Sequence, residues 1–146
     1  MKDGTKGDPA EGNVQERIRS IWEGDRVARL FDMRLVEAGA GYAVVAASVK
    51  EPYLNAHHIA HGALFFAVAD LAFALSVNAE ADAVGVQWSF NVFRSAAAGE
   101  EVVAESRVIH RGRQSVVAEL SVRSGEGKLL VKGQATALPL PRRRDG

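Results

Sequence analysis

Asp70 is the residue whose type and position most clearly indicate chemistry. It stands in the longest apolar run of the chain, residues 63–79. Apolar residues cover every side of a helix over this run, so the helix must be buried nearly all round. Burying an unpaired carboxylate costs free energy, so Asp70 must be neutral, hydrogen-bonded or turned towards a cleft. Such an acid is a candidate functional group, and the alternative is a structural acid held by backbone or Asn partners.

The start of this helix is a second place where chemistry is expected. Residues 50–62 form a polar loop that ends at Gly62. Unpaired N–H groups and the positive end of the helix dipole favour a developing negative charge there, and Gly62 lets a substrate carbonyl approach the backbone closely. Asp70 lies roughly 12 Å further along the helix axis. The two groups of one chain are therefore too far apart to act on the same carbonyl, whereas a two-fold partner can bring its Asp70 opposite Gly62.

Three histidines in the loop raise the question of a metal. His57, His58 and His61 lie close together in the sequence, but their spacing matches no ordinary zinc motif and no further Cys or His ligand follows nearby. No metal site is predicted. His61 is expected either to cap the helix or to act as a neutral, orienting histidine.

Composition limits the function classes. The 146 residues include 18 basic and 18 acidic residues and no cysteine. Zero net charge gives no nucleic-acid or membrane-surface signature, and the missing cysteine excludes disulfides, thiolate metal sites and cysteine nucleophiles. The apolar helix is slightly short for a membrane span and carries a central acid. The N-terminal residues lack the apolar core of a signal peptide, so a cytoplasmic protein is expected.

The hydrophobic pattern predicts a single α+β domain over residues 13–138. Residues 1–12 are expected to be disordered, and residues 139–146 to form a frayed tail. Helical periodicity covers residues 14–31, with a break at Gly24. Strands are expected as a pair within 34–49 and at 84–93, 101–110, 114–123 and 128–138. One small sheet cannot cover an all-apolar helix, so a second subunit or the N-terminal helix must cover the rest.

Several of these residues together resemble a known family. Asn55 is followed six residues later by His61-Gly62, and Ala69-Asp70 places the acid nine residues after the histidine. This order resembles the hotdog-fold acyl-CoA thioesterases, in particular the phenylacetate-degradation (PaaI-like) branch. Phe93-Arg94, on the strand after the helix, extends the resemblance. The family pattern has a second glycine where this chain has Ala63, and it often carries a hydroxyl near Gln87.

The resemblance implies a hotdog fold, with an antiparallel sheet wrapped around the central helix. It implies a homodimer with active sites at the interface, arranged as a dimer of dimers in a homotetramer. Asp70 would be the general base or nucleophile, and the Gly62 N–H would stabilise the oxyanion. Asn55 and His61 would position the thioester, and Gln87 would hydrogen-bond near the acid. Arg111 and Arg113 would be candidates for coenzyme A phosphates.

The predicted function is hydrolysis of a small or aromatic acyl-CoA to a free acid and coenzyme A, without a metal or redox cofactor. A hydroxyacyl-CoA dehydratase or hydratase on the same fold is an alternative, and it needs a His paired with an acid in one site. A non-catalytic acyl-CoA-binding protein is another. A DNA-binding role has no support, because the sequence shows neither a helix pair of that kind nor a basic patch.

Overall fold

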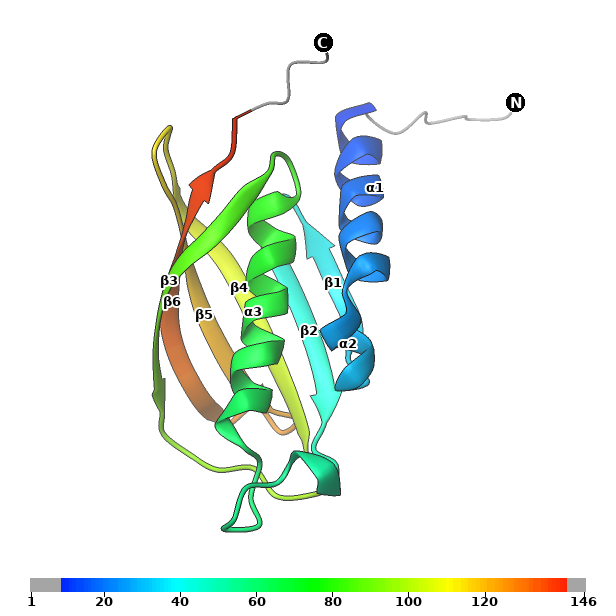
Figure 1. The fold of residues 1–146 in the computed structure, drawn as a ribbon, viewed down its shortest axis with the longest axis vertical. Coiled ribbons are helices and arrows are strands. Elements are labelled where there is room, and N and C mark those ends of the chain that lie inside the picture. Colours follow the sequence, from blue (N-terminus) through cyan, green and yellow to red (C-terminus); the bar gives the residue numbers. More distant parts are fainter. Residues whose placement is uncertain (1–8, 142–146) are drawn as a thin grey trace, which may run out of the picture.

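The computed structural model describes residues 9–141, which form one antiparallel sheet wrapped around a central helix (Figure 1). The elements in chain order are α1 (Pro9–Gly24), α2 (Arg26–Leu30), β1 (Arg34–Gly39), β2 (Tyr42–Ser48), a 3-10 turn (Glu51–Tyr53), α3 (Gly62–Asn78), β3 (Ala83–Val92), β4 (Glu101–Arg111), β5 (Val116–Ser124) and β6 (Leu129–Pro139). The six strands are ordered β1-β2-β4-β5-β6-β3, and all neighbours pair antiparallel. The α+β prediction is confirmed.

Helix α3 supplies the centre of the core. Ten of its side chains are buried, and they meet small apolar residues that β2, β4 and β5 turn inwards. Bulk on the helix and small residues on the strands allow the sheet to curve closely around it. Among residues 9–141, no helix is both long enough and apolar enough to cross a membrane.

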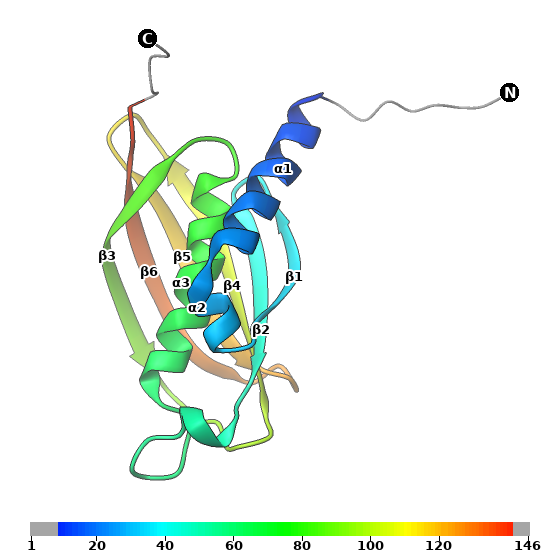
Figure 2. The same ribbon diagram turned by 45° about the vertical axis from the view of Figure 1, so that its right-hand side comes forward.

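Helices α1 and α2 cover one side of α3, and β3 lies on the other side (Figures 1 and 2). Ile18 is the buried residue of the α1 face, and Ala28 that of α2. The break predicted at Gly24 is confirmed: Asp25 starts α2 by accepting a hydrogen bond from the Ala28 N–H at 2.9 Å.

Both ends of the expected domain differ from the prediction. Helix α1 begins at Pro9, so residues 9–12 are helical where disorder was expected. Proline suits the first turn of a helix because its missing N–H has no intrahelical partner there. At the other end, Pro139 closes β6 and the Leu140 N–H donates to the Asp82 carbonyl at 2.9 Å, so the first residues of the expected tail are held. Residues 1–8 and 142–146 lie outside the described part of the chain.

Strand β3 departs from the simple alternation that its sequence predicts. A register shift between Gly85 and Gln87 interrupts the pairing with β6. Trp88 turns towards α3, but Val84 and Val86 are about half exposed. The prediction that alternate residues from 84 to 92 form one half-buried face is therefore wrong for the valines, because a bulge reverses side-chain direction.

Gly133 on β6 allows β3 to approach closely. A Cβ at this position would lie 2.2 Å from the Ser89 carbonyl oxygen and 2.4 Å from Phe90 Cδ1. Gly133→Ala is expected to destabilise the protein by about 1–3 kcal/mol, the usual cost of overpacking, measured by urea denaturation. Gly12→Ala is the matched control, because its Cβ would meet no atom within 4 Å and alanine is the better helix former. Equal stability of the two variants would contradict the prediction.

Candidate functional site

His61 caps the start of α3. Its backbone is extended, with φ −64° and ψ 141°, and its Nδ1 accepts a hydrogen bond from the Ala63 N–H at 2.9 Å. An accepting Nδ1 carries no proton, so the neutral ring has its proton on Nε2. The cap satisfies the second N–H of the helix. The Gly62 N–H, which is the first, has no hydrogen-bond partner among residues 9–141.

Asn55 builds the loop that delivers Gly62 to this position. Its side-chain Oδ1 accepts from the His57 N–H at 2.9 Å and from the Ile59 N–H at 3.4 Å. Its backbone N–H donates to the Ile59 carbonyl at 2.8 Å, which closes the loop. The His61 N–H then donates to the Tyr53 carbonyl at 2.8 Å. The loop is therefore fixed at both ends by backbone groups.

A cavity of about 300 Å³ opens at the N-terminus of α3. Asn55 and Gly62 line it, together with Phe65 and the segment that follows β3. That segment contributes Arg94, an exposed side chain that also lines a larger neighbouring hollow. A free backbone N–H and a cation therefore share one cavity.

Asp70 lies along α3 from this cavity, on the one stripe of the helix that the protomer leaves partly open. The stripe recurs at every fourth residue and contains Phe66, Asp70, Ala74 and Asn78. A second cavity, of about 260 Å³, lies between the helix and β3, and Asp70 and Trp88 both line it. The structure thus brings Asn55 and Gly62 together and keeps Asp70 apart, as the helix geometry predicted.

Burial raises the pKa of Asp70 above its ordinary value. Two weaker influences act on the same carboxyl: the Trp88 indole N–H nearby lowers the pKa, and the negative charge of Asp25 raises it. Trp88 Nε1 is itself buried and has no hydrogen-bond partner among residues 9–141. The indole N–H therefore favours the carboxylate form of Asp70, although the two groups form no hydrogen bond in this structure.

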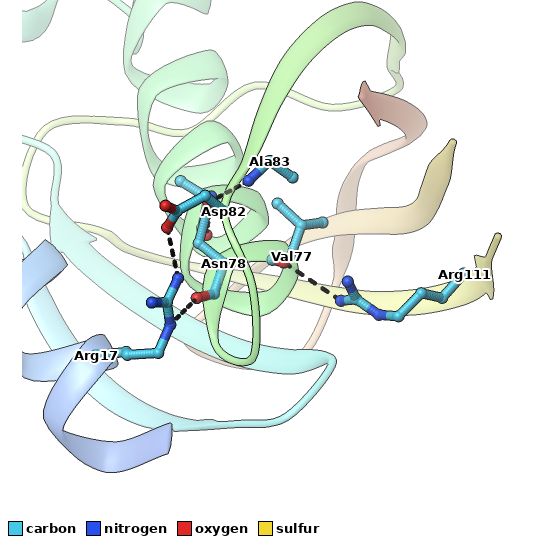
Figure 3. Close-up of polar contacts among 7 residues, drawn as sticks. Arg17, Val77, Asn78, Asp82, Ala83 and Arg111 are labelled. Atoms are coloured by element: carbon cyan, nitrogen blue, oxygen red, sulfur yellow. Dashed lines mark hydrogen bonds and ion pairs between the residues drawn. The ribbon is translucent and has the colours of Figure 1, made fainter. Parts of the chain in front are cut away.

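Two arginines occupy the opposite end of α3 (Figure 3). Arg17 donates to the Asn78 carbonyl at 3.0 Å and pairs with Asp82 at 2.6 Å. Arg111 donates to the Val77 carbonyl at 3.3 Å. Cations at the last carbonyls of a helix stabilise its negative end. Arg111 therefore caps α3 roughly 22 Å along the helix from Gly62, which does not favour the predicted phosphate-binding role at the Gly62 cavity of the same protomer.

The other two predicted substrate-binding residues also lie outside both cavities. Gln87 is exposed on β3, and the alternation of the strand points it away from Trp88. Arg113 lies in the β4–β5 turn, where it forms no hydrogen bond or ion pair with another described residue. In this protomer neither residue lies with Asp70 or with Gly62.

Sequence reasoning did not select Arg94 or assign Trp88 a role at the acid. The sequence signal for Arg94 was the Phe93-Arg94 pair that extends the resemblance, whereas its place beside the start of α3 follows from the sheet order. Trp88 was expected to be a core aromatic or a pocket wall. Its place beside Asp70 at the same cavity depends on the bulge in β3, for which Gly85 within the strand is only a weak signal.

The arrangement provides two chemical elements at two places. At the start of α3, an unsatisfied N–H and a helix dipole can stabilise an oxyanion. Midway along α3, a partly buried acid with a raised pKa can accept a proton or attack a carbonyl. Acyl transfer to water needs both elements on one substrate.

Comparison with known proteins agrees with this chemistry. The family model of the thioesterase superfamily matches residues 57–131. The acyl-coenzyme A thioesterase PaaI of Escherichia coli is 29% identical over 108 residues, covering 73% of this chain and 77% of that protein. The solved structure of E. coli PaaI superposes with a TM-score of 0.86, covering 90% of this chain and 96% of that one, at 24% identity.

Two further solved structures are similar. A variant of the phenylacetic acid degradation protein PaaI from Thermus thermophilus has a TM-score of 0.77 at 32% identity, covering 80% of this chain and all of that one (100%). A Streptococcus mutans protein bound to acetyl-CoA has a TM-score of 0.72 at 26% identity, covering 77% of this chain and 91% of that one. The family match, which covers more than half of the chain, and these neighbours confirm the resemblance seen in the sequence. The chain therefore belongs to the thioesterase superfamily, as a hotdog-fold, PaaI-like thioester hydrolase.

Proposed function

We propose that the protein hydrolyses an acyl-CoA thioester to a free acid and coenzyme A, in active sites shared between two copies of the chain. The unpaired Gly62 N–H at the capped start of α3 is the observation that carries this proposal. The first N–H of a helix has no intrahelical partner, and Gly62 is exposed, so this donor faces the cavity and is available to a charge that develops during reaction. The related Streptococcus mutans protein bound to acetyl-CoA supports the substrate class.

In this mechanism the thioester carbonyl oxygen points at the Gly62 N–H. Asp70 of the second copy accepts a proton from water as the water attacks, or attacks the carbonyl itself. The carbonyl oxygen gains negative charge in the tetrahedral intermediate, and the helix N-terminus stabilises it. The C–S bond then breaks, and coenzyme A leaves as its thiol with the proton that Asp70 took from water. If Asp70 itself attacks, the departing thiolate takes a proton from solvent, and water then hydrolyses the acyl–Asp70 anhydride to the free acid. Asn55 and His61 hold the loop geometry that aims the Gly62 N–H.

The free edge of the sheet supports pairing of two copies. Strand β3 is an end strand of ten residues, so its outer backbone groups have no strand partner among residues 9–141 of the protomer. Val84, Val86, Val92 and Phe93 are all 47–59% exposed on or beside it. A long, apolar sheet edge is a template for pairing with another chain. Edge-to-edge pairing of β3 would bring the open stripe of one α3 towards the other copy, and two such dimers would form the predicted tetramer.

Aromatic rings near Asp70 support a small or aromatic acyl group. Phe66 contacts Trp88 and Phe90, with ring centroids 5.7 Å and 5.4 Å apart. Phe66 is 40% exposed in the protomer, so it is available to a substrate or to the second copy. Flat rings at such a wall favour an apolar, compact acyl chain. Arg94 is positioned to attract the anionic end of coenzyme A.

Coenzyme A release from a panel of aryl and short-to-long acyl thioesters tests the activity. We expect turnover with at least one aryl or short acyl-CoA. Binding of acyl-CoA without release of coenzyme A would instead support a binding protein, and formation of an enoyl product from a hydroxyacyl-CoA would support a dehydratase. Either result would overturn the proposal.

Mixing two inactive variants tests the shared site. If Asp70 and Gly62 of one site come from different copies, a mixed dimer of Asp70→Asn and Gly62→Pro chains holds one intact site and one doubly substituted site. Random exchange makes half of the dimers mixed, so we expect recovery of about a quarter of wild-type activity. A mixture that stays as inactive as its components, although native mass spectrometry shows that the copies exchange, would place both groups in one chain.

A further inference from the structure

We infer that the Trp88 indole N–H is the positioning group for the Asp70 carboxylate: it holds the ionised acid at the wall of the cavity that both residues line. The inference rests on the proposed function for the role of Asp70, and it adds a residue and a contact specific to this chain.

The position of the indole nitrogen is the first observation. Trp88 Nε1 is buried, and no acceptor among residues 9–141 satisfies it. A buried donor without a partner costs about 1–3 kcal/mol, so such groups are uncommon in folded proteins. Asp70 lines the same cavity of about 260 Å³. Among the residues that line this cavity, Asp70 alone carries an ionisable side chain.

The indole ring is held firmly in place. Phe66 packs against it with ring centroids 5.7 Å apart, and Phe73 packs edge-on at 6.2 Å. The backbone also makes room for it: a Cβ on Gly85 would lie 2.4 Å from Trp88 Cζ2 and 2.8 Å from Cη2. Gly85 stands beside the register shift in β3. Glycine, bulge and aromatic rings together fix the direction of the N–H.

The fixed indole N–H stabilises the ionised form of Asp70 more than the neutral form. The carboxylate gains a charge-assisted hydrogen bond when it turns to the indole, and the neutral acid gains much less. Of the other charged groups, Asp25 at the start of α2 acts on Asp70 and favours the neutral acid. Asn78 is the remaining polar side chain of the cavity, and its Oδ1 accepts from the Ala83 N–H at 2.7 Å. Among the described residues that act on Asp70, Trp88 is thus the neighbour that favours the ionised form.

Tryptophan fluorescence tests this contact without any substrate. The chain has two tryptophans, so Trp22→Phe leaves Trp88 as the only indole. We expect its emission to change in a single transition above the ordinary titration range of an aspartate, because a charge that appears beside an indole shifts its emission. The transition should vanish in Asp70→Asn and persist in Asp25→Asn, both made in the Trp22→Phe background. A transition that survives Asp70→Asn, or no transition at all, would overturn the inference.

The pH dependence of activity is the second test. Trp88→Phe keeps an aromatic ring and removes the N–H, so the acidic limb of the kcat profile should move to higher pH. Each unit of displacement lowers activity on that limb about tenfold, because the ionised fraction falls tenfold. Gly85→Ala should move the limb in the same direction by displacing the ring. Phe90→Leu is the control, since it changes the aromatic cluster and leaves the N–H in place.

These outcomes separate a positioning role from a packing role. A residue that only packs would lower activity equally at every pH and leave the limb where it is, which would refute the inference. If the protein hydrolyses no thioester, the proposed function fails, but the fluorescence titration still decides whether Trp88 holds Asp70.

Discussion

Asp70→Asn is expected to lower kcat for thioester hydrolysis by about 10²- to 10⁴-fold, the contribution of a positioned general base. The amide has nearly the same shape as the carboxyl and can still meet Trp88, but it can neither take a proton from water nor attack a carbonyl. KM should change little, because in the proposed mechanism the acid contacts the reacting atoms rather than the coenzyme. Steady-state release of coenzyme A under saturating substrate measures the effect.

Asp32→Asn is the matched control. It also removes one carboxylate, but from an exposed ion pair with Lys50 at 2.7 Å. Unchanged turnover in this variant would show that the loss is specific to position 70. Activity of Asp70→Asn within a few-fold of wild type would identify Asp70 as a structural acid and contradict the proposed mechanism.

The same substitution has an expected effect on stability. Burial raises the pKa of Asp70 above the ordinary value of 3.8, so the unfolded chain gives up this proton at lower pH than the folded chain. The folded state therefore loses relative stability as the pH rises from 3.8 to the raised pKa. Asp70→Asn should thus have a higher Tm than wild type above this window, and the difference should shrink below it. Calorimetry at several pH values measures this.

Gly62→Pro is expected to lower kcat by about 10²- to 10³-fold, the usual cost of removing one oxyanion donor. Proline has no N–H, and it is well tolerated at the first position of a helix. The preceding residue must be extended, and His61 already is, with φ −64° and ψ 141°. The substitution therefore removes the donor from an otherwise suitable backbone. Single-turnover kinetics would place the loss in the chemical step.

Gly62→Ala keeps the N–H and serves as the paired variant. Its Cβ would meet no atom within 4 Å, so the protein should fold normally and retain most of its activity. If both variants lose activity to the same extent, the loss comes from the added side-chain atoms, which both variants share. The Gly62 N–H would then not be the oxyanion donor.

Most helices and strands of this fold could be predicted from the periodicity of apolar residues along the sequence. The run 63–79 differs by one residue at each end from α3, and the later strands fall within two residues of their predicted bounds. These segments are long and strongly patterned, so local sequence suffices. The bulge in β3 is different. Gly85, a glycine within a strand, is only a weak signal for a bulge, yet the bulge decides which side chains face α3.

The residues of the candidate site also fall into two groups, those that local sequence predicts and those that depend on the tertiary fold. Asn55, His61 and Gly62 were predictable because they belong to one loop, where order along the chain fixes proximity. Arg111 was assigned to a phosphate from its turn, whereas β4 carries it to the last carbonyls of α3. Trp88 and Arg94 depend on which strand ends beside which part of the helix. That is a property of the sheet order, and local sequence does not contain it.

The sheet order also constrains how the protein is made. Among the described residues β3 pairs with one strand, β6, and β6 is synthesised after β4 and β5. A growing chain can assemble the β2-β4-β5 layer on α3 before β6 is available to pair with residues 83–92. The wall that faces Asp70 and the apolar edge that would bind a second copy are therefore completed only after residues 129–139 have been synthesised. During that interval the nascent chain exposes a valine-rich strand, and it is then most at risk of aggregation and most in need of a chaperone.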